Sequence, residues 1–302
     1  MSYEKIILTQ MLFSLYLPII GNLCEGVCDL NYLRYIIELP SGICIEHYLP
    51  SRIERQNHIL FVHGNFCGSW CWHNLLKYFA SRGTSCYAVN FRGHWLSYGH
   101  AELGKAVTED YVKDVEECLQ AIGAGEVILV GHSMGGIVSQ RVAENNSIKS
   151  LILLDSAPCK EITETCFKVN PEVNKVLKDL FNHQPDGTVL MEKDKDKIKK
   201  IVFEKNKVSE ETLSQTVAFM GRESAHVLKN HAFLSVDPKK ITCSVYLIGR
   251  KGLGNDENPD LWHALADYYN ATDRFVSGDI SHNMFMENDW EKHAELIENW
   301  IK

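Results

Sequence analysis

The sequence predicts an α/β protein with a mostly parallel central sheet, helices on both faces of that sheet and an inserted helical cap. Three observations support this prediction. Short, nearly all-apolar runs alternate with amphipathic stretches at helical spacing, a pattern typical of strands buried on both faces of a parallel sheet. One of these runs continues directly into Gly131-His132-Ser133-Met134-Gly135, which fits a sharp turn from a strand into a helix. Residues 160–236 contain no such run, and their apolar residues fall at helical spacing.

The composition is that of an ordinary globular protein. The chain has 302 residues, of which 45% are hydrophobic and 23% are charged, which is ample material for a core. Its net charge is −8, and we find no cluster of basic residues with interleaved aromatic residues, so we expect no nucleic-acid partner. The ten cysteines lie in apolar surroundings without paired histidines at ligand spacing, so we expect no metal site and no cofactor.

Residues 1–30 precede the predicted α/β domain. Residues 6–20 are almost all apolar, which matches the apolar region of a signal peptide but is short for a membrane span. Pro18 interrupts this run and no A-x-A-like cleavage site follows it, which favours a surface-packed or disordered leader. Free cysteines favour a reducing compartment and therefore a cytoplasmic location. A secreted or membrane-anchored protein is the alternative if residues 1–25 are a signal segment, and membrane contact is expected only through residues 6–20.

The first half of the predicted domain begins with a β-hairpin. Residues 32–39 and 42–48 alternate or run apolar on either side of Pro40-Ser41-Gly42, as in two strands joined by a turn. Strands and helices then alternate, which is the order expected of a parallel sheet. The elements expected after the hairpin are strands at 58–62 and 85–89 and helices at 70–81 and 108–122.

The turn at Ser133 lies between the apolar run 127–130, which follows Glu126, and a predicted helix that begins at Gly136. Gly131 and Gly135 let the backbone fold back tightly and keep Cβ atoms away from the serine, so its hydroxyl is left at the tip of the turn. The N-terminus of the helix directs partial positive charge at the same hydroxyl. Ser133 is therefore the candidate nucleophile.

The strand pattern stops after residue 155 and resumes at residue 244. We expect a core made of residues 31–159 and 237–302, interrupted by a helical cap at 160–236 over the C-terminal edge of the sheet. The elements expected in this half are strands at 150–155, 244–249 and 274–277, helices at 260–269 and 289–301, and a loop at 278–282.

The turn at Ser133 resembles the nucleophile elbow of the α/β-hydrolase family. Two further motifs resemble the family in the right order, namely His63-Gly64 after a predicted strand and Arg92-Gly93-His94-x-x-Ser97, to which we assign a structural role. The resemblance covers residues 32–302. It implies a serine hydrolase, of the esterase or lipase kind, with a catalytic triad, an oxyanion hole and a cap.

A serine hydroxyl is a poor nucleophile until a neighbouring base takes its proton. His282 follows the last predicted strand and precedes the last predicted helix, as the family order Ser–acid–His requires. This position places an imidazole in a loop at the C-terminal edge of the sheet, where it can approach Ser133. We therefore expect His282 to be the base.

The triad acid has two candidates. The usual position of the acid in the family, shortly beyond the glycine that ends the strand at Gly249, is held here by Gly252, which departs from the family pattern. Asp256 lies further along the same loop. Asp155 ends the preceding strand, a position from which some relatives supply their carboxylate. A residue at the end of a strand is held more rigidly than one further along a loop, which slightly favours Asp155. Both candidates stay open.

The oxyanion of the tetrahedral intermediate needs backbone N–H donors. The resemblance implies that Met134, directly after the nucleophile, is one donor. The resemblance of His63-Gly64 to the family motif implies that the backbone N–H of Asn65, the next residue, is the second donor, with that of Phe66 as its alternative.

The predicted reaction is the hydrolysis of a carboxylic ester or thioester of a hydrophobic small molecule through an acyl-serine intermediate. The apolar cap residues, with Trp70, Trp72 and Trp95, suggest a hydrophobic acyl or aryl group. The alternatives are a thioesterase or a carbon–carbon bond hydrolase with the same triad, or a ligand-binding member of the fold without catalysis.

Overall fold

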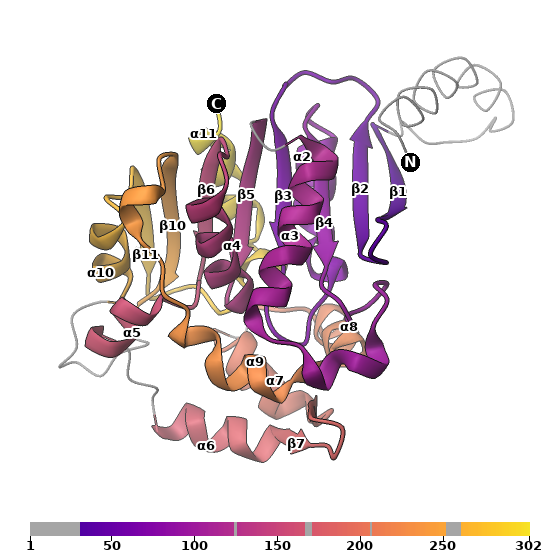
Figure 1. The fold of residues 1–302 in the computed structure, drawn as a ribbon, viewed down its shortest axis with the longest axis vertical. Coiled ribbons are helices and arrows are strands. Elements are labelled where there is room, and N and C mark those ends of the chain that lie inside the picture. The colour runs from indigo at the N-terminus through magenta and orange to yellow at the C-terminus, as the bar shows by residue number, and fades with distance from the viewer. Residues whose placement is uncertain (1–30, 124–125, 167–170, 206, 252–260) are drawn as a thin grey trace, which may run out of the picture. The chain divides into compact units, whose positions relative to one another are not determined.

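The computed structural model describes residues 31–123, 126–166, 171–205, 207–251 and 261–302. Within these residues, an eight-stranded sheet forms the centre of the unit Tyr32–Lys302. The expectations for residues 1–30, including the apolar run 6–20, fall outside the described residues, as does Asp256. In their order across the sheet the strands are β1 (Tyr32–Glu38), β2 (Cys44–Pro50), β4 (Ser85–Asn90), β3 (His58–Val62), β5 (Val127–His132), β6 (Ser150–Leu154), β10 (Ser244–Arg250) and β11 (Asp273–Ser277), as Figure 1 shows.

The pairing of the strands confirms a mostly parallel sheet. β1 and β2 form the predicted hairpin and β2 is antiparallel to β4, while the pairs from β4 through β11 are parallel. His132 of β5 is in register with Leu154 of β6, and Ile248 of β10 is in register with the same Leu154. Because parallel strands end at one edge of the sheet, Ser133 and Asp155, which follow β5 and β6, are neighbours at that edge.

Apolar side chains alternate between the two faces of the sheet and build a core on each. Along β3, Leu60 and Val62 belong to one core, and Ile59 and Phe61 belong to the other. The first core includes side chains of α3, α4 and α10, and the second includes side chains of α2 and α11, so helices cover both faces (Figure 1). The bounds of these helices are α2 (His73–Ala80), α3 (Thr108–Ile122), α4 (Met134–Asn145), α10 (Leu261–Tyr268) and α11 (Glu291–Trp300).

Between β6 and β10 the chain makes a long insertion, which Figure 1 shows alongside the carboxyl ends of the parallel strands. The sequence predicts helices alone here, but the described residues also contain a small antiparallel sheet. Its strands have three or four residues, too few to show an alternating pattern in the sequence. The elements of the insertion are α5 (Lys160–Cys166), α6 (Pro171–Leu180), β7 (Phe181–His183), β8 (Thr188–Met191), α7 (Lys195–Val202), α8 (Glu210–Phe219), β9 (Arg222–Ser224) and α9 (Ala225–Asn230).

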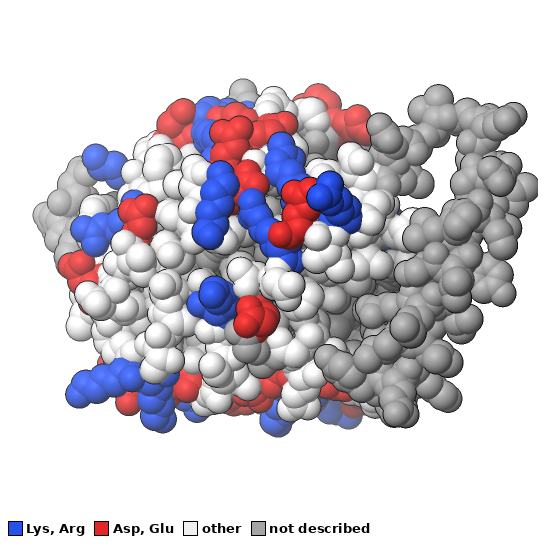
Figure 2. Space-filling model, turned by 90° about the horizontal axis from the view of Figure 1, so that it is seen from above, with Lys and Arg blue, Asp and Glu red and all other residues white. Residues whose placement is uncertain are grey.

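Short 3₁₀ helices connect several of these elements. Their bounds are η1 (Ser69–Trp72), η2 (His100–Lys105), η4 (His231–Phe233), η5 (Pro238–Lys240) and η6 (Met284–Met286). None of the described helices combines the length and apolarity needed to cross a membrane. On the face drawn in Figure 2, the Lys and Arg side chains are interspersed with those of Asp and Glu, so neither sign of charge dominates this face.

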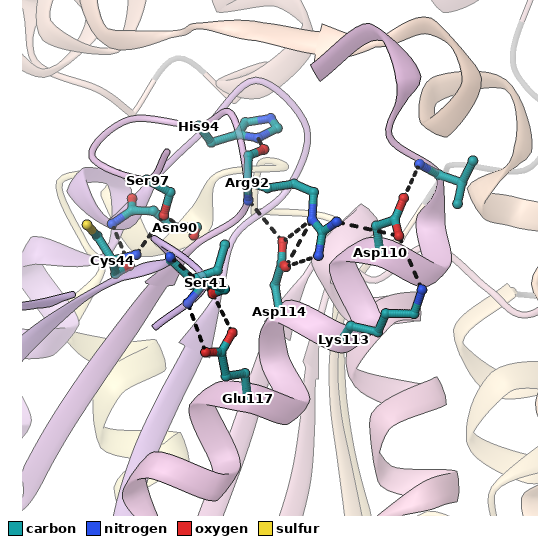
Figure 3. Close-up of polar contacts among 12 residues, drawn as sticks. Ser41, Cys44, Asn90, Arg92, His94, Ser97, Asp110, Lys113, Asp114 and Glu117 are labelled. Carbon is teal, nitrogen blue, oxygen red and sulfur yellow. Dashed lines mark hydrogen bonds and ion pairs between the residues drawn. The ribbon is translucent and has the colours of Figure 1, made fainter. Parts of the chain in front are cut away.

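The turn after β4 is held by its own polar side chains, as Figure 3 shows. Arg92 donates from Nη2 to Asp114 of α3 at 2.6 Å, and its backbone N–H donates to the same carboxylate. Ser97 Oγ accepts from the backbone N–H of Cys44 at 2.8 Å and donates to the backbone carbonyl of Asn90. These bonds tie the turn to β2, β4 and α3.

A buried ion pair joins the insertion to the core. Glu223 of β9 is fully buried, accepts from the Tyr111 hydroxyl at 2.6 Å and lies 3.3 Å from Nε2 of His94. Burial raises the pKa of the Glu223 carboxyl, but the charge and hydrogen bond of His94 outweigh burial and lower it. Burial lowers the pKa of His94, and the Glu223 carboxylate outweighs that effect and raises it. Both groups are therefore charged at mildly acidic pH.

Glu223→Gln should destabilise the protein by about 3 kcal/mol, because it leaves the His94 imidazolium buried without a counter-ion. The lowered pKa of Glu223 contributes stability above the unfolded value near 4.5, and this contribution disappears as the pH falls. The raised pKa of His94 contributes stability below the unfolded value near 6.5, and this contribution disappears as the pH rises. Urea unfolding of both proteins should therefore show the largest difference between about pH 4.5 and 6.5 and a smaller one at about pH 9.

The matched control for this prediction is Glu102→Gln, which removes the exposed Glu102–Lys105 pair. An exposed pair adds little to stability, so this variant should unfold like the wild type at each pH. A Glu223→Gln variant as stable as the wild type at pH 5.5 would contradict the role given to the buried pair.

Candidate active site

Ser133 sits in a strained turn between β5 and α4, with φ at 54° and ψ at −125°. A positive φ in a non-glycine residue costs on the order of 1–3 kcal/mol and persists only where the surrounding structure enforces it. The flanking glycines permit the close packing around this turn, because a Cβ on Gly131 would overlap Ser139 and a Cβ on Gly135 would overlap the backbone carbonyl of His63. The geometry is that of the sharp strand-to-helix turn predicted from the sequence.

Asp155 and His282 are in direct contact at the edge of the sheet that carries Ser133. His282 Nδ1 lies 2.5 Å from Asp155 Oδ2. Burial raises the pKa of the Asp155 carboxyl, but the charge of Arg250 and the hydrogen bond of His282 outweigh burial and lower this pKa to about 2. Asp155 is therefore a buried carboxylate at neutral pH. The Nδ1 atom of His282 carries a proton and donates it in a hydrogen bond to the Asp155 carboxylate.

His132, the last residue of β5, fixes the backbone of His282 in the loop after β11. Its Nε2 lies 3.0 Å from the backbone carbonyl of His282, and the centroids of the two rings are 4.5 Å apart. Burial and the nearby His282 place the pKa of His132 well below its usual value, so His132 is neutral and Nε2–H donates to the carbonyl. No role for His132 was predicted from the sequence. Its position directly before Ser133 is the sequence feature that could have indicated one.

With Nδ1 bound to Asp155, Nε2 is the nitrogen of His282 that can accept a proton. Among the described residues, neither this nitrogen nor the Ser133 hydroxyl has a hydrogen-bond partner. Ser133 follows His132 directly, and His132 contacts both the ring and the backbone of His282. Hydrogen bonds between nucleophile and base are often open in free enzymes and close in the complex with substrate.

The loop after β3 lies against Ser133. A Cβ on Gly64 would come within 2.9 Å of the Ser133 Cβ, so only glycine allows this approach. His63 organises the loop, because its Nδ1 lies 2.8 Å from the Gly64 carbonyl and its Nε2 accepts from the Phe91 backbone N–H at 3.3 Å. Burial is the main reason that the pKa of His63 falls to about 3, so this imidazole stays neutral.

Three backbone N–H groups are candidates for an oxyanion hole. Met134 is the first residue of α4, where a backbone N–H has no partner within the helix. Asn65 and Phe66 follow Gly64, and Phe66 takes a positive φ of 64°. The backbone carbonyl of Phe66 accepts from the Gly221 N–H of the insertion at 2.8 Å, which fixes this loop.

Two charged side chains that the sequence analysis did not single out contact the Asp155–His282 pair. Arg250 ends β10 and donates from Nε to Asp155 Oδ2 at 2.6 Å and from its backbone N–H to Oδ1 at 3.2 Å. Its Nη1 is hydrogen-bonded to Glu204 of the insertion, which also accepts from the His282 backbone N–H at 3.3 Å. The departure from the family pattern just after Gly249 was the signal in the sequence that this strand end is unusual.

A cavity of about 580 Å³ opens between the insertion and the turn after β4. Its lining includes Cys67, just beyond the candidate oxyanion loop, together with Trp95 and Phe219, whose ring centroids are 5.1 Å apart. The centroid of Trp70 lies 5.7 Å from that of the same phenylalanine. Trp72 instead is fully buried in the core against Phe285 and is not placed to line a binding site.

The comparisons with known sequences match part of the chain. A family profile described as "alpha/beta hydrolase fold" matches residues 57–183. Methylesterase 4 of Arabidopsis thaliana is 33% identical over 89 residues, which are 28% of this chain and 34% of that protein. The carbendazim hydrolyzing esterase of Nocardioides is 31% identical over 99 residues, 32% of this chain and 40% of that protein. The chain thus aligns with well under half the length of these curated relatives.

Solved structures resemble the chain over most of its length. Polyneuridine aldehyde esterase has a TM-score of 0.63 at 16% identity, covering 82% of this chain and 100% of the other. The methylesterase MES16 from Arabidopsis has a TM-score of 0.61 at 18% identity, covering 81% and 98%. At these identities the likeness concerns the fold. The fold, the elbow at Ser133 and the family profile over residues 57–183 agree, and the chain has the α/β-hydrolase fold.

Proposed function

We propose that this protein is a serine esterase that cleaves a carboxylic ester of a hydrophobic small molecule. The observation that carries the proposal is the 2.5 Å contact between His282 and Asp155 at the same sheet edge as the strained Ser133 turn. A nucleophile, a base and an orienting acid at one edge form the constellation that acyl transfer requires.

In the proposed reaction, His282 Nε2 takes the proton of the Ser133 hydroxyl as its oxygen attacks the ester carbonyl. Asp155 holds the proton on Nδ1 and stabilises the imidazolium that forms. The backbone N–H groups of Met134 and Asn65, with Phe66 as the alternative second donor, receive the developing oxyanion. His282 then protonates the leaving alcohol, and water, activated by the same imidazole, cleaves the acyl-serine.

The substrate class is inferred from the relatives and from the cavity. Relatives carry names such as methylesterase, carbendazim hydrolyzing esterase and methyl jasmonate esterase, which support a small-molecule ester. Trp95 and Phe219 line the cavity of about 580 Å³ together with Asp186 and Arg222, and neither Ser133 nor His282 lines it, so this cavity offers apolar surface beside the candidate site and not at the triad itself. A cavity of this size is in the usual range for small-molecule sites.

The purified protein should hydrolyse p-nitrophenyl esters. Across a panel of these esters with acyl groups of increasing length, kcat/KM should be highest for one acyl length. Thioesters with the same acyl groups should be measured alongside, because the same triad can cleave esters and thioesters. The class with the higher kcat/KM identifies the preferred leaving group as an alcohol or a thiol. A folded protein that cleaves none of these compounds but binds apolar esters would contradict the proposal and indicate a ligand-binding member of the fold.

A further inference from the structure

Asp155 accepts hydrogen bonds from the Arg250 guanidinium and the His282 ring at once. The same oxygen, Oδ2, lies 2.6 Å from Arg250 Nε and 2.5 Å from His282 Nδ1. Arg250 Nη2 is also 3.4 Å from His282 Nδ1. A guanidinium is charged at every pH of interest, so it opposes the positive charge that His282 must take up during catalysis.

Glu204 is placed to remove this conflict. It belongs to the insertion, between α7 and α8, and pairs with Arg250 Nη1 while accepting from the His282 backbone N–H at 3.3 Å. The Arg250 side chain is only 14% exposed, so its interactions are weakly screened by solvent. Two carboxylates and one guanidinium leave one net negative charge around His282, which a protonated imidazole neutralises. Without Glu204, the protonated imidazole would instead leave the cluster positive.

We propose that Glu204 is a positioning residue for His282, and that it supplies the negative charge that lets an imidazolium form beside the guanidinium of Arg250. The proposal rests on the proposed esterase function for its kinetic consequences. The insertion thereby contributes a charged side chain to the surroundings of the base, through the contacts of Glu204 with Arg250 and with the His282 backbone.

The other titratable and charged groups near His282 leave this assignment in place. His132, from β5, is neutral because burial and His282 hold its pKa well below the usual value. Glu287 is buried, hydrogen-bonds Ser281 at 2.6 Å, and has its pKa raised mainly by burial. Lys207 is paired with Asp279 at 2.6 Å. Among the residues that the structure describes, the charged groups that contact His282 are thus Asp155, Arg250 and Glu204.

The test compares the pH dependence of kcat/KM in Glu204→Gln, Arg250→Gln and the double variant. Glu204→Gln should move the midpoint of the acid limb to lower pH by about one unit and reduce kcat about tenfold, because the protonated base is disfavoured. Arg250→Gln should move the midpoint to higher pH, and the double variant should return close to the wild type. A purely structural role would lower activity without moving the midpoint in opposite directions.

Glu204→Asp, which keeps the charge, should leave the midpoint in place. Glu298→Gln is the matched control, because Glu298 pairs with Arg55 at 2.8 Å, is 16% exposed and contacts none of the cluster residues. The NMR titration of the His282 ring in the same variants needs no substrate and should show the same opposite movements. The proposal would be overturned if Glu204→Gln and Arg250→Gln left the midpoint of that titration unchanged or moved it in the same direction. If the two variants move the midpoint in opposite directions but the protein hydrolyses no ester, only the esterase function would be overturned.

Discussion

Ser133→Ala should lower kcat for p-nitrophenyl ester hydrolysis by about 10⁴–10⁶-fold, because it removes the atom that forms the acyl intermediate. The variant should fold normally. Ser133 Oγ has no hydrogen-bond partner among the described residues, so its loss breaks no bond, and alanine occupies the same positive-φ position with a similar steric cost. Initial rates at saturating substrate and the midpoint of thermal unfolding measure the two expectations.

The control for this variant is Ser81→Ala, at the C-terminal end of α2, where the hydroxyl donates to the Tyr78 carbonyl at 3.0 Å. This variant should keep its activity, because it lies on a helix that carries no candidate catalytic group. A Ser133→Ala protein with more than a small fraction of wild-type turnover would show that another group carries the reaction.

Asp155→Asn should lower kcat by about 10⁴-fold at neutral pH, while Asp256→Asn should change it little. An amide at position 155 cannot accept strongly from both His282 and Arg250, and its NH₂ group can stabilise the wrong tautomer of the imidazole. The low pKa of Asp155, about 2, means that its carboxylate is present throughout the pH range of the assay. The loss should therefore appear at every pH between about 5 and 9.

The pair of variants decides between the two acids that the sequence leaves open. Asp256 lies outside the described residues, so kinetics is the direct comparison. If Asp256→Asn loses several orders of magnitude in kcat and Asp155→Asn remains active, the contact between Asp155 and His282 is structural and the assignment made here is wrong.

Most of the fold could be predicted from the sequence because its signals are local. Buried strands of five to seven residues and the helix Thr108–Ile122 carry strong periodicity, and the structure has them close to the predicted bounds. The strands of the small sheet in the insertion are too short to show a period, so helices alone were expected there.

The candidate site was predictable only in part, because its acid and its charge cluster depend on which strand ends meet. The motif around Ser133 and the order of His282 along the chain are sequence features, so both residues could be proposed from the sequence. The contact of Asp155 with His282 depends on which strand ends meet, which a single sequence does not reveal. Glu204 lies 46 positions before Arg250 in the chain, and no motif connects these two residues.

The most direct test of the account is to map the covalent adduct of a fluorophosphonate probe by peptide mass spectrometry. The account predicts one adduct on the peptide that contains Ser133, formed quickly by the wild type, slowly by Asp155→Asn and not at all by Ser133→Ala. An adduct on another residue, or labelling of Ser133→Ala at the wild-type rate, would contradict the assignment of Ser133, His282 and Asp155 as the catalytic triad.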